Sequence, residues 1–456
     1  MRRLLLVLLL AGVLPGQRPS SAAPLLGVNF HGPIDQGVVM ALEALGARIV
    51  RTEVGFNNVF PEPGRPSFGG FDRTVAGLRA GRRELIVLLT YSPLWASRQT
   101  AARYGYPTDP KMVQSYFVPP DRLSAWADYV RAVARRYRPV LYYELWNEAN
   151  GRWFLPQGVS TPPQVRREIL ARYYVPMLEV TRQVLRKEDP GARLIGPGAV
   201  NDVKGEFLLD LVRAGAGPLL DGVSIHVYPD PDRPFSSFLY WWRRQEEVLR
   251  EVRALSGRTL PVVVSEIGLE RARPGRTDLE ADFFRLALPR ILRFPGVDAI
   301  AVHCLVDGGP GGGRFGLSDR GRPLPSGSAL ATVASLIGAG PVRPVPDLRM
   351  RLARRVAGEV VDGACLEVGT ESDRRWVLVL TRGFGGWSPP PAGALEPTRI
   401  TVRLPAPAAR AWEVGPDGAR RSLRCTRSDR GWALTIDMPA VKEDRAWPVR
   451  VMVLGR

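Results

Sequence analysis

The sequence has few cysteines and few histidines. Its 456 residues include three of each. Three cysteines can form at most one internal disulfide, which excludes a scaffold stapled by several bridges. Cys365 and Cys425 share the C-terminal region, so one bridge between them and free thiols both remain open. The histidines lack the spacing of metal ligands, so we expect neither a metal ion nor another cofactor.

Long apolar runs are also missing after the first residues of the chain. No later segment approaches the roughly 18 consecutive apolar residues of a membrane-spanning helix. Arg2 and Arg3 precede a short apolar run at 4–10, and small residues occupy 20–23. This arrangement predicts a signal peptide over residues 1–23, and therefore a secreted or periplasmic protein without a membrane span in the mature chain. An uncleaved anchor is the alternative, which the shortness of the run disfavours.

Lysine is scarce, although the chain is strongly basic. The formal net charge is +18, and only four of the 63 basic residues are lysines. The arginines are spread along the whole chain, which is typical of a compositional bias rather than of a nucleic-acid binding face. We therefore expect no nucleic-acid partner, with an acidic polymer as the alternative.

Strand and helix patterns alternate over residues 25–338. The expected strands cover 25–30, 47–54, 85–90, 140–146, 194–196, 223–227, 262–265 and 299–305. The expected helices cover 38–45, 71–80, a segment capped by Asp121 and ending at 137, 163–186, 205–214, 238–255, 279–292 and 328–337. This order predicts an α/β fold with a (β/α)8 TIM barrel over residues 24–340. A doubly wound open sheet is the rival, but no Gly-rich phosphate turn follows the first strand.

Short alternating strands replace this pattern after a proline-punctuated linker at 341–346. They cover 376–380, 399–404, 434–436 and 449–454, and turn residues separate them. The pattern predicts an all-β sandwich domain over residues 341–456.

Polar and aromatic residues gather where the expected barrel strands end. They are Asn29, His31, Arg51, Glu53, Tyr91, Trp95, Asn147, Glu148, His226, Tyr228, Glu266, His303 and Asp307. Chemistry in such barrels takes place at the C-terminal ends of the strands. Because all three histidines of the chain lie there, we expect one shared pocket.

Two of these glutamates, Glu148 and Glu266, lie in similar stretches of sequence. The stretch LYYELWNEAN at 141–150 ends in a polar cluster around Glu148, and PVVVSEIG at 261–268 stops on Glu266. Two facing carboxylates can cleave a glycosidic bond, since one donates a proton and the other attacks the sugar. A separation of about 5–5.5 Å would fit retention of configuration, and about 6.5–9.5 Å would fit inversion.

The motifs WNEAN at 146–150 and SEIG at 265–268 resemble the two signatures of the clan A retaining glycoside hydrolases. Within that clan the chain is most similar to family 39, the β-xylosidase and α-L-iduronidase group, and to family 5 relatives. The resemblance covers about residues 25–338 and implies a (β/α)8 barrel. It also implies that Glu148 is the acid/base and Glu266 the nucleophile.

The same resemblance suggests roles for neighbouring residues and shows two departures. It implies that Asn147 binds the sugar 2-hydroxyl, that Arg51 lies near the nucleophile and that Tyr228 hydrogen-bonds it. The clan usually has proline where this chain has Ala149, and often a tryptophan where this chain has His303. The second departure concerns the identity of the sugar more than the chemistry.

We expect substrate contacts from the strand-end residues around the two acids. They are Asn147, Arg51, His226, Tyr228, Trp146, Trp95, His31 and His303. Each has a structural alternative: the tryptophans could pack the barrel top, and Glu266 could be only an ion-pair partner of Arg51. Glu144 faces the barrel interior by strand alternation, so we expect a buried ion pair or hydrogen bond there rather than catalysis.

These patterns together favour an exported retaining glycoside hydrolase. It would cleave O-glycosidic bonds of an oligo- or polysaccharide by double displacement with the two glutamates. The alternative from another class is a catalytically silent carbohydrate-binding protein on a glycosidase-like barrel.

Overall fold

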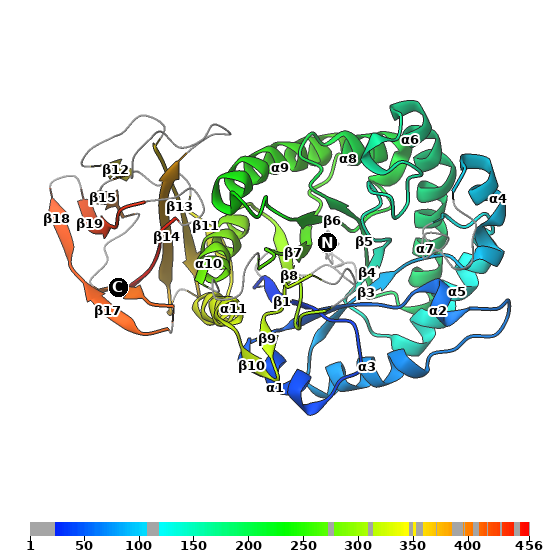
Figure 1. Ribbon diagram of the computed structural model, residues 1–456, viewed down its shortest axis with the longest axis horizontal. Helices are drawn as coiled ribbons and strands as arrows, with labels where there is room; N and C mark the ends of the chain where they lie inside the picture. Colours follow the sequence, from blue (N-terminus) through cyan, green and yellow to red (C-terminus); the bar gives the residue numbers. More distant parts are fainter. Residues whose placement is uncertain are drawn as a thin grey trace, which may run out of the picture.

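The computed structural model describes residues 23–455, except 107–117, 272–277, 309–312, 346–349, 353–358, 371, 385–394, 396, 405–409, 417, 429–430 and 442–446. It consists of a barrel followed by a β-domain (Figure 1). Residues 1–22 of the predicted signal peptide lie outside the described residues. No helix among the described residues is long and apolar enough to cross a membrane.

Eight parallel strands close into a barrel in chain order, with β1 paired to both β2 and β8. They are β1 (Leu25–Asn29), β2 (Ile49–Glu53), β3 (Glu84–Leu89), β4 (Tyr142–Leu145), β5 (Arg193–Val200), β6 (Gly222–Val227), β7 (Val262–Ile267) and β8 (Val297–Val302). The predicted TIM barrel is therefore confirmed.

Helices surround this barrel (Figure 1). They are α1 (Gln36–Ala44), α2 (Phe56–Val59), α3 (Gly69–Ala80), α4 (Leu94–Tyr104), α5 (Leu123–Tyr137), α6 (Pro163–Ile169), α7 (Val175–Glu188), α8 (Glu206–Leu211), α9 (Pro234–Ser256), α10 (Asp278–Leu292) and α11 (Pro325–Ile337). Turns of π-helix, η3 (Leu170–Tyr174) and η4 (Val212–Ala216), continue α6 and α8.

Two details differ from the sequence prediction. The short helices α2 and α4 were not expected. Asp121 does not cap α5: Arg122 occupies the N-cap position and makes no side-chain cap bond. The Asp121 carboxylate instead accepts a hydrogen bond of 2.7 Å from the backbone N–H of Gln99, which ties α4 to the start of α5.

Strand alternation divides the barrel interior into an apolar layer and a polar layer. The apolar layer is a cluster of Leu25, Ile49, Ile86, Tyr142, Ile195, Val263 and Ala299. Two or four positions further along their strands lie Asn29, Arg51, Glu144 and Ser265, all buried, which we call the polar layer. Side chains of one strand face inward at every second position, so the apolar layer fixes which residues reach the C-terminal mouth.

The C-terminal domain contains two antiparallel sheets, which confirms the predicted sandwich. One has the order β11-β13-β14-β20-β16-β17 and the other β12-β15-β19-β18. Their strands are β11 (Val342–Pro344), β12 (Met350–Leu352), β13 (Glu359–Val368), β14 (Arg375–Phe384), β15 (Thr398–Arg403), β16 (Arg410–Val414), β17 (Arg420–Leu423), β18 (Cys425–Ser428), β19 (Gly431–Met438) and β20 (Val449–Gly455). The predicted linker at 341–346 was wrong in part, because β11 lies within it and pairs with β13.

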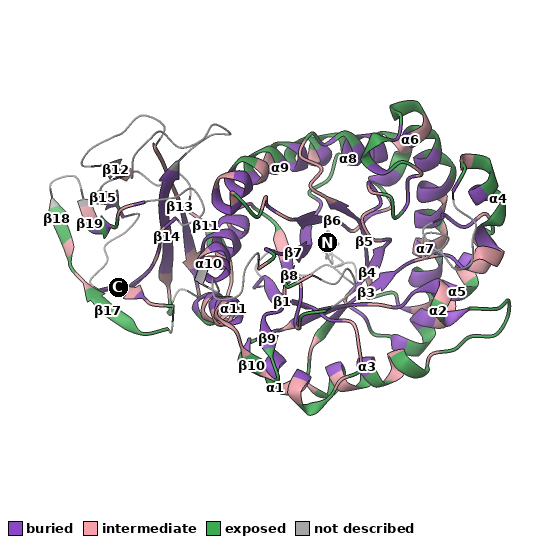
Figure 2. Ribbon diagram, in the orientation of Figure 1, coloured by how far each residue is buried: buried purple, intermediate pink, exposed green. Residues whose placement is uncertain are grey.

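The central strands β14 and β20 of the six-stranded sheet are buried on both faces, and β14 is mostly purple in Figure 2. Alternate residues of β14 and β20 belong to two clusters: Val377 and Val451 join the core shared with the barrel helices, whereas Leu378 and Met452 face the second sheet. At the barrel side, Trp447 stacks on Phe235 of α9 with ring centroids 5.9 Å apart. The two domains therefore share one continuous core.

All three cysteines are free thiols. Of the two possibilities for Cys365 and Cys425, the structure selects free thiols over a bridge.

Candidate active site

Arg51 is the centre of the polar layer. Its guanidinium donates to Glu144 Oε2 and Glu266 Oε1, each at 2.5 Å, and to Asn29 Oδ1 and Asn147 Oδ1, each at 2.9 Å. The side chains of Arg51 and Glu144 have no exposed surface. Because a planar guanidinium carries five donors in a fixed fork, it can hold several acceptors from different strands in one geometry.

Glu144 belongs to this buried network, as the sequence analysis predicted. Its second oxygen accepts a 2.6 Å hydrogen bond from Ser265 Oγ, next to Glu266 on β7. Asn29 Nδ2 donates to the carbonyl of Ser265 at 2.8 Å, so a third strand is tied to the same point. Glu266 is therefore mounted on strands that buried hydrogen bonds hold in register.

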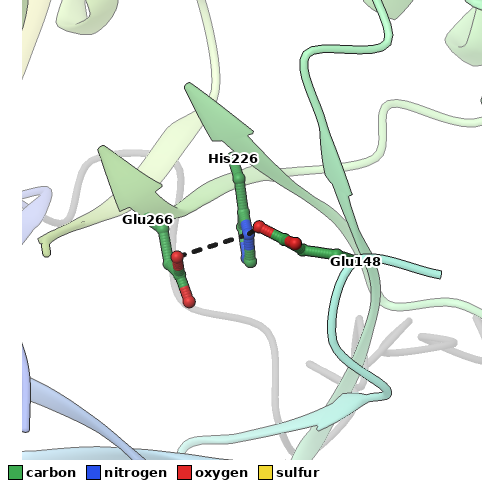
Figure 3. Close-up of side chains that lie close together, drawn as sticks. All are labelled: Glu148, His226 and Glu266. Atoms are coloured by element: carbon green, nitrogen blue, oxygen red, sulfur yellow. Dashed lines mark hydrogen bonds and ion pairs between the residues drawn. The ribbon is translucent and has the colours of Figure 1, made fainter. Parts of the chain in front are cut away.

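Glu148 and Glu266 face one another across His226 (Figure 3). His226 Nδ1 lies 3.2 Å from Glu148 Oε1 and 3.5 Å from Glu266 Oε2. One atom of each side chain, a ring nitrogen and two carboxylate oxygens, lies within 4.8 Å of the others. The polypeptide thus brings together two acids that are 118 positions apart in the sequence.

Local backbone geometry turns Glu148 toward this point. Trp146 and Glu148 both have positive φ, 68° and 46°, in the left-handed region that most residues avoid. Gly198 of β5 leaves room beside them: a Cβ there would lie 3.1 Å from His226 Nε2 and 3.3 Å from Glu144 Oε1. A larger residue at this position would press on the ring that lies between the acids.

The surroundings of Glu266 favour its charged form. Burial alone would raise the pKa of Glu266, but the attraction of His226 and Arg51 outweighs it and lowers that pKa to about 2. Tyr228 also donates its hydroxyl proton to Glu266 Oε2. Glu266 is therefore ionised over the whole neutral range and is held at both oxygens.

Three other side chains surround Glu266. His303 Nδ1 lies 3.9 Å from Glu266 Oε2 and has no hydrogen-bond partner among the described residues. Burial and the charge of Arg51 lower the pKa of His31 to about 4, which keeps that ring neutral. Phe315 packs against His303 and Tyr228, with ring centroids 5.3 and 5.8 Å away. Neutral rings and an unpartnered nitrogen suit an uncharged, hydroxyl-rich ligand.

A fourth carboxyl group, Glu53, lies at the end of β2. Burial raises the pKa of Glu53 against the attraction of Arg51. Tyr91 lies near Glu53 and hydrogen-bonds with Asn147. Burial, together with the charges of Glu53 and Glu148, raises the pKa of Tyr91. These residues extend the site from Glu148 toward β2 and β3.

The predicted site residues divide into two groups. Asn147, Arg51, His226, Tyr228, His31 and His303 surround the two glutamates. Trp146 is fully buried among Tyr91, Trp126 and Phe154, so its ring offers no surface to a substrate. The structure thus assigns it to packing, and the prediction of a substrate contact by Trp146 was wrong. Trp95 also belongs to the second group, the tryptophans that pack against other aromatic side chains. It lies on α4, its ring packs on Phe56, and its indole N–H donates to Phe60 O at 3.1 Å.

Two contributors were not among the predicted substrate contacts. Phe315 comes from the loop after β8, and Tyr91 follows β3. The sequence placed Tyr91 in the shared pocket, from its position at a strand end, but not among the substrate contacts. Phe315 lies 12 residues beyond His303, away from any strand end, and gave no such signal.

The donor set could also hold a metal ion, since Glu148, His226 and Glu266 offer three ligand atoms within 4.8 Å. Arg51 lies 2.5 Å from Glu266, however, and this fixed positive charge disfavours a cation at the same carboxylate. The site therefore fits a neutral substrate better than a resident metal.

Comparison with known proteins gives likenesses in structure but not in sequence. No family model and no curated protein matches the sequence. A family 39 glycoside hydrolase from Bacteroides cellulosilyticus WH2 aligns with 95% of this chain and 81% of its own, at 19% identity and a TM-score of 0.63. A family 30 subfamily 8 xylanase from Clostridium acetobutylicum aligns with 95% of this chain and 97% of its own, at 13% identity and a TM-score of 0.56. A family 39 β-xylosidase from Caulobacter crescentus aligns with 96% of this chain and 98% of its own, at 16% identity and a TM-score of 0.52. At these identities the likenesses show that the chain has the barrel-and-sandwich fold of these glycoside hydrolases.

Proposed function

We propose that the protein is a retaining glycoside hydrolase that cleaves an O-glycosidic bond by double displacement. The observation that carries the proposal is the approach of Glu148 and Glu266, whose nearest oxygens are within 4.8 Å. This spacing is compatible with the roughly 5–5.5 Å between carboxyl groups of retaining enzymes, and it is short of the about 6.5–9.5 Å that admits a water between them.

In the first step, Glu266 attacks the anomeric carbon while Glu148 donates its proton to the departing glycosidic oxygen. The bond to the leaving group breaks and a covalent glycosyl ester with Glu266 forms. Arg51 and Tyr228 support this role, because they keep the attacking carboxylate ionised and oriented. Glu148 must hold its proton at this stage.

In the second step, Glu148 acts in the opposite direction. Its carboxylate takes a proton from water, and the resulting hydroxide attacks the anomeric carbon and releases Glu266. His226, 3.2 Å from Glu148 Oε1, is placed to orient this carboxyl group in both steps. Two inversions at one carbon give net retention.

The structural likenesses support the same function. The similar structures are named as a family 39 glycoside hydrolase, a xylanase and a β-xylosidase. We therefore propose an oligo- or polysaccharide substrate, with xylosides as the first compounds to test. Export is a further part of the proposal and rests on the N-terminal sequence; amino-terminal sequencing of protein recovered from outside the cytoplasm should begin near residue 24.

Azide rescue of two alanine variants tests the roles of the glutamates. Glu266→Ala should lose turnover, and with an activated aryl glycoside azide should yield the glycosyl azide of inverted configuration. Glu148→Ala should instead yield the azide of retained configuration, because the covalent intermediate still forms. Glu43→Ala, at an exposed position of α1, serves as the control and should keep wild-type turnover. Undiminished hydrolysis by Glu266→Ala would remove Glu266 from the mechanism.

The second candidate, a silent carbohydrate-binding protein, makes a different prediction. It would bind a glycan tightly, and the wild-type protein would cleave none of a broad panel of chromogenic glycosides. An ionised Glu266 beside the unpartnered Nδ1 of His303 could bind a sugar without cleaving it. Binding alone would not require a second carboxyl group at Glu148, whereas cleavage would.

A further inference from the structure

The loop after β4 displays one aromatic side chain while it buries its neighbours. Trp146, Phe154 and Leu155 are almost fully buried, whereas Trp153 is 38% exposed. Among the described residues Trp153 is the only tryptophan exposed to that extent. The indole N–H of Trp146 donates to the carbonyl of Trp153, so the buried ring fixes the backbone from which Trp153 projects.

This exposed indole lies beside Glu148. The backbone N–H of Gly151 donates to the carbonyl of Glu148 at 2.7 Å, which closes a tight turn between them. A Cβ at Gly151 would lie 3.4 Å from Trp153 Cδ1 and 4.0 Å from Glu148 Cβ. The side chains of Trp153 and Glu148 therefore flank the same glycine.

A second aromatic ring continues this surface. Tyr91 and Trp153 have ring centroids 6.4 Å apart and an interplanar angle of 33°, so the two faces are only moderately tilted. Tyr91 also hydrogen-bonds with Asn147, the residue before Glu148. The pair forms a wall on the Glu148 side, whereas His31, His303 and Phe315 lie on the Glu266 side.

The proposed reaction assigns different parts of a substrate to these two sides. The proton donor must face the glycosidic oxygen, so the leaving group extends past Glu148, while the sugar under attack rests against Glu266. Sugar rings and aryl groups present apolar faces that pack on indole and phenol rings. Scattered exposed aromatics are ordinary on protein surfaces, but this one adjoins the proton donor and a second ring.

We propose that Trp153 and Tyr91 form the binding site for the leaving group, and that it recognises the flat apolar face of a sugar or aryl ring. This inference rests on the proposed glycosidase function and adds the part of the substrate that the two glutamates do not define. It makes Trp153 a specificity-determining residue that acts through contact with the departing group.

Substrates that differ only in the leaving group test the inference. Wild type and Trp153→Ala are compared on a 4-nitrophenyl glycoside and on the glycosyl fluoride of the same sugar, since fluoride is too small to reach Trp153. We expect kcat/KM of Trp153→Ala to fall about fivefold to tenfold on the aryl glycoside, in the upper part of the range of about twofold to tenfold that a lost aromatic contact implies. On the fluoride it should stay within about twofold. Trp153→Phe should recover most of the loss.

Tyr240→Ala serves as the matched control, because Tyr240 is 49% exposed on the outer helix α9. It should behave as wild type on both substrates. An equal loss on both substrates in Trp153→Ala would indicate a structural role and overturn the inference, as would unchanged kinetics on both. A wild-type protein that hydrolyses neither compound, across a panel of sugars, would instead refute the glycosidase proposal and the inference with it.

Discussion

Replacing Arg51 with methionine removes a buried cation from between two carboxylates and leaves the apolar length of the side chain in place. Glu144, which has no exposed surface, then loses the guanidinium that lies 2.5 Å from its carboxylate. Glu266 loses one of its two hydrogen-bond donors, Arg51 and Tyr228. Removing one partner of a buried ion pair typically costs about 3–5 kcal/mol, because the other charge stays buried and uncompensated. We expect Arg51→Met to lower the free energy of unfolding by that amount.

The double variant Arg51→Met, Glu144→Gln separates this electrostatic effect from lost packing. It removes the stranded charge as well, so it should be more stable than Arg51→Met by about 1–3 kcal/mol, within the usual range of coupling energies. Arg182→Met is a control, since its ion pair with Asp221 is partly exposed and should contribute about 1 kcal/mol or less.

Urea unfolding at pH 7, followed by tryptophan fluorescence, measures all four proteins. The pH profile of kcat/KM gives a second readout: without the attraction of Arg51, the pKa of Glu266 should rise and the acidic limb should move to higher pH. A cost below about 1 kcal/mol for Arg51→Met, or a double variant that is less stable than the single one, would refute this account of the polar layer.

Further predictions concern pH, the domain contact, the thiols and metal ions. Because the pKa of Glu266 is lowered from 4.5 to about 2 in the folded state, its charge stabilises the fold fully above pH 4.5. This contribution is lost as pH falls through the folded-state pKa of about 2. The unfolding free energies of wild type and Glu266→Gln, which differ on the order of 3 kcal/mol at pH 7, should therefore converge only near pH 2. Trp447→Ala removes the ring stacked on Phe235 and should cost about 3–5 kcal/mol in thermal unfolding, whereas a loss under 1 kcal/mol would contradict the shared core. An Ellman titration of the folded protein should detect the half-buried Cys425 alone and three thiols after denaturation; fewer than three without reductant would indicate a disulfide. Prolonged EDTA treatment should leave hydrolysis unchanged, and loss of activity that a divalent cation restores would contradict our assignment of a metal-free site.

The barrel could be predicted from the sequence because its strands bear a strong local signal. They are apolar runs separated by amphipathic helices, and buried parallel strands require such runs. The catalytic candidates followed from the same reasoning, since Glu148 lies just beyond the C-terminal end of β4 and Glu266 near the C-terminal end of β7. The sandwich was predicted only in outline: β16, β17 and β18 have only four or five residues each, and β17 and β18 carry few apolar side chains, so they give little local signal although they pair with near neighbours in the sequence.

The arrangement around the glutamates depended on contacts that local patterns do not encode. Phe315 reaches the site from a loop, and the sequence gives no indication of where a loop side chain points. Trp146 was expected to contact the substrate because it lies close to Glu148 in the sequence, but its ring is fully buried among other aromatic side chains. Asp121 has the character of a helix cap, but the backbone of α4, a helix that was not expected, competes for its carboxylate.

The burial of β14 and β20 on both faces has a consequence for how this protein can evolve. A module joined through a flexible linker can be exchanged between enzymes with little change to either part. Here β14 and β20 contribute alternate residues to the core shared with the catalytic barrel and to the core of the sandwich. An inherited substitution in either strand is therefore constrained by two sets of neighbours at once, and transfer of this domain to another barrel would require a helical surface already shaped to receive it.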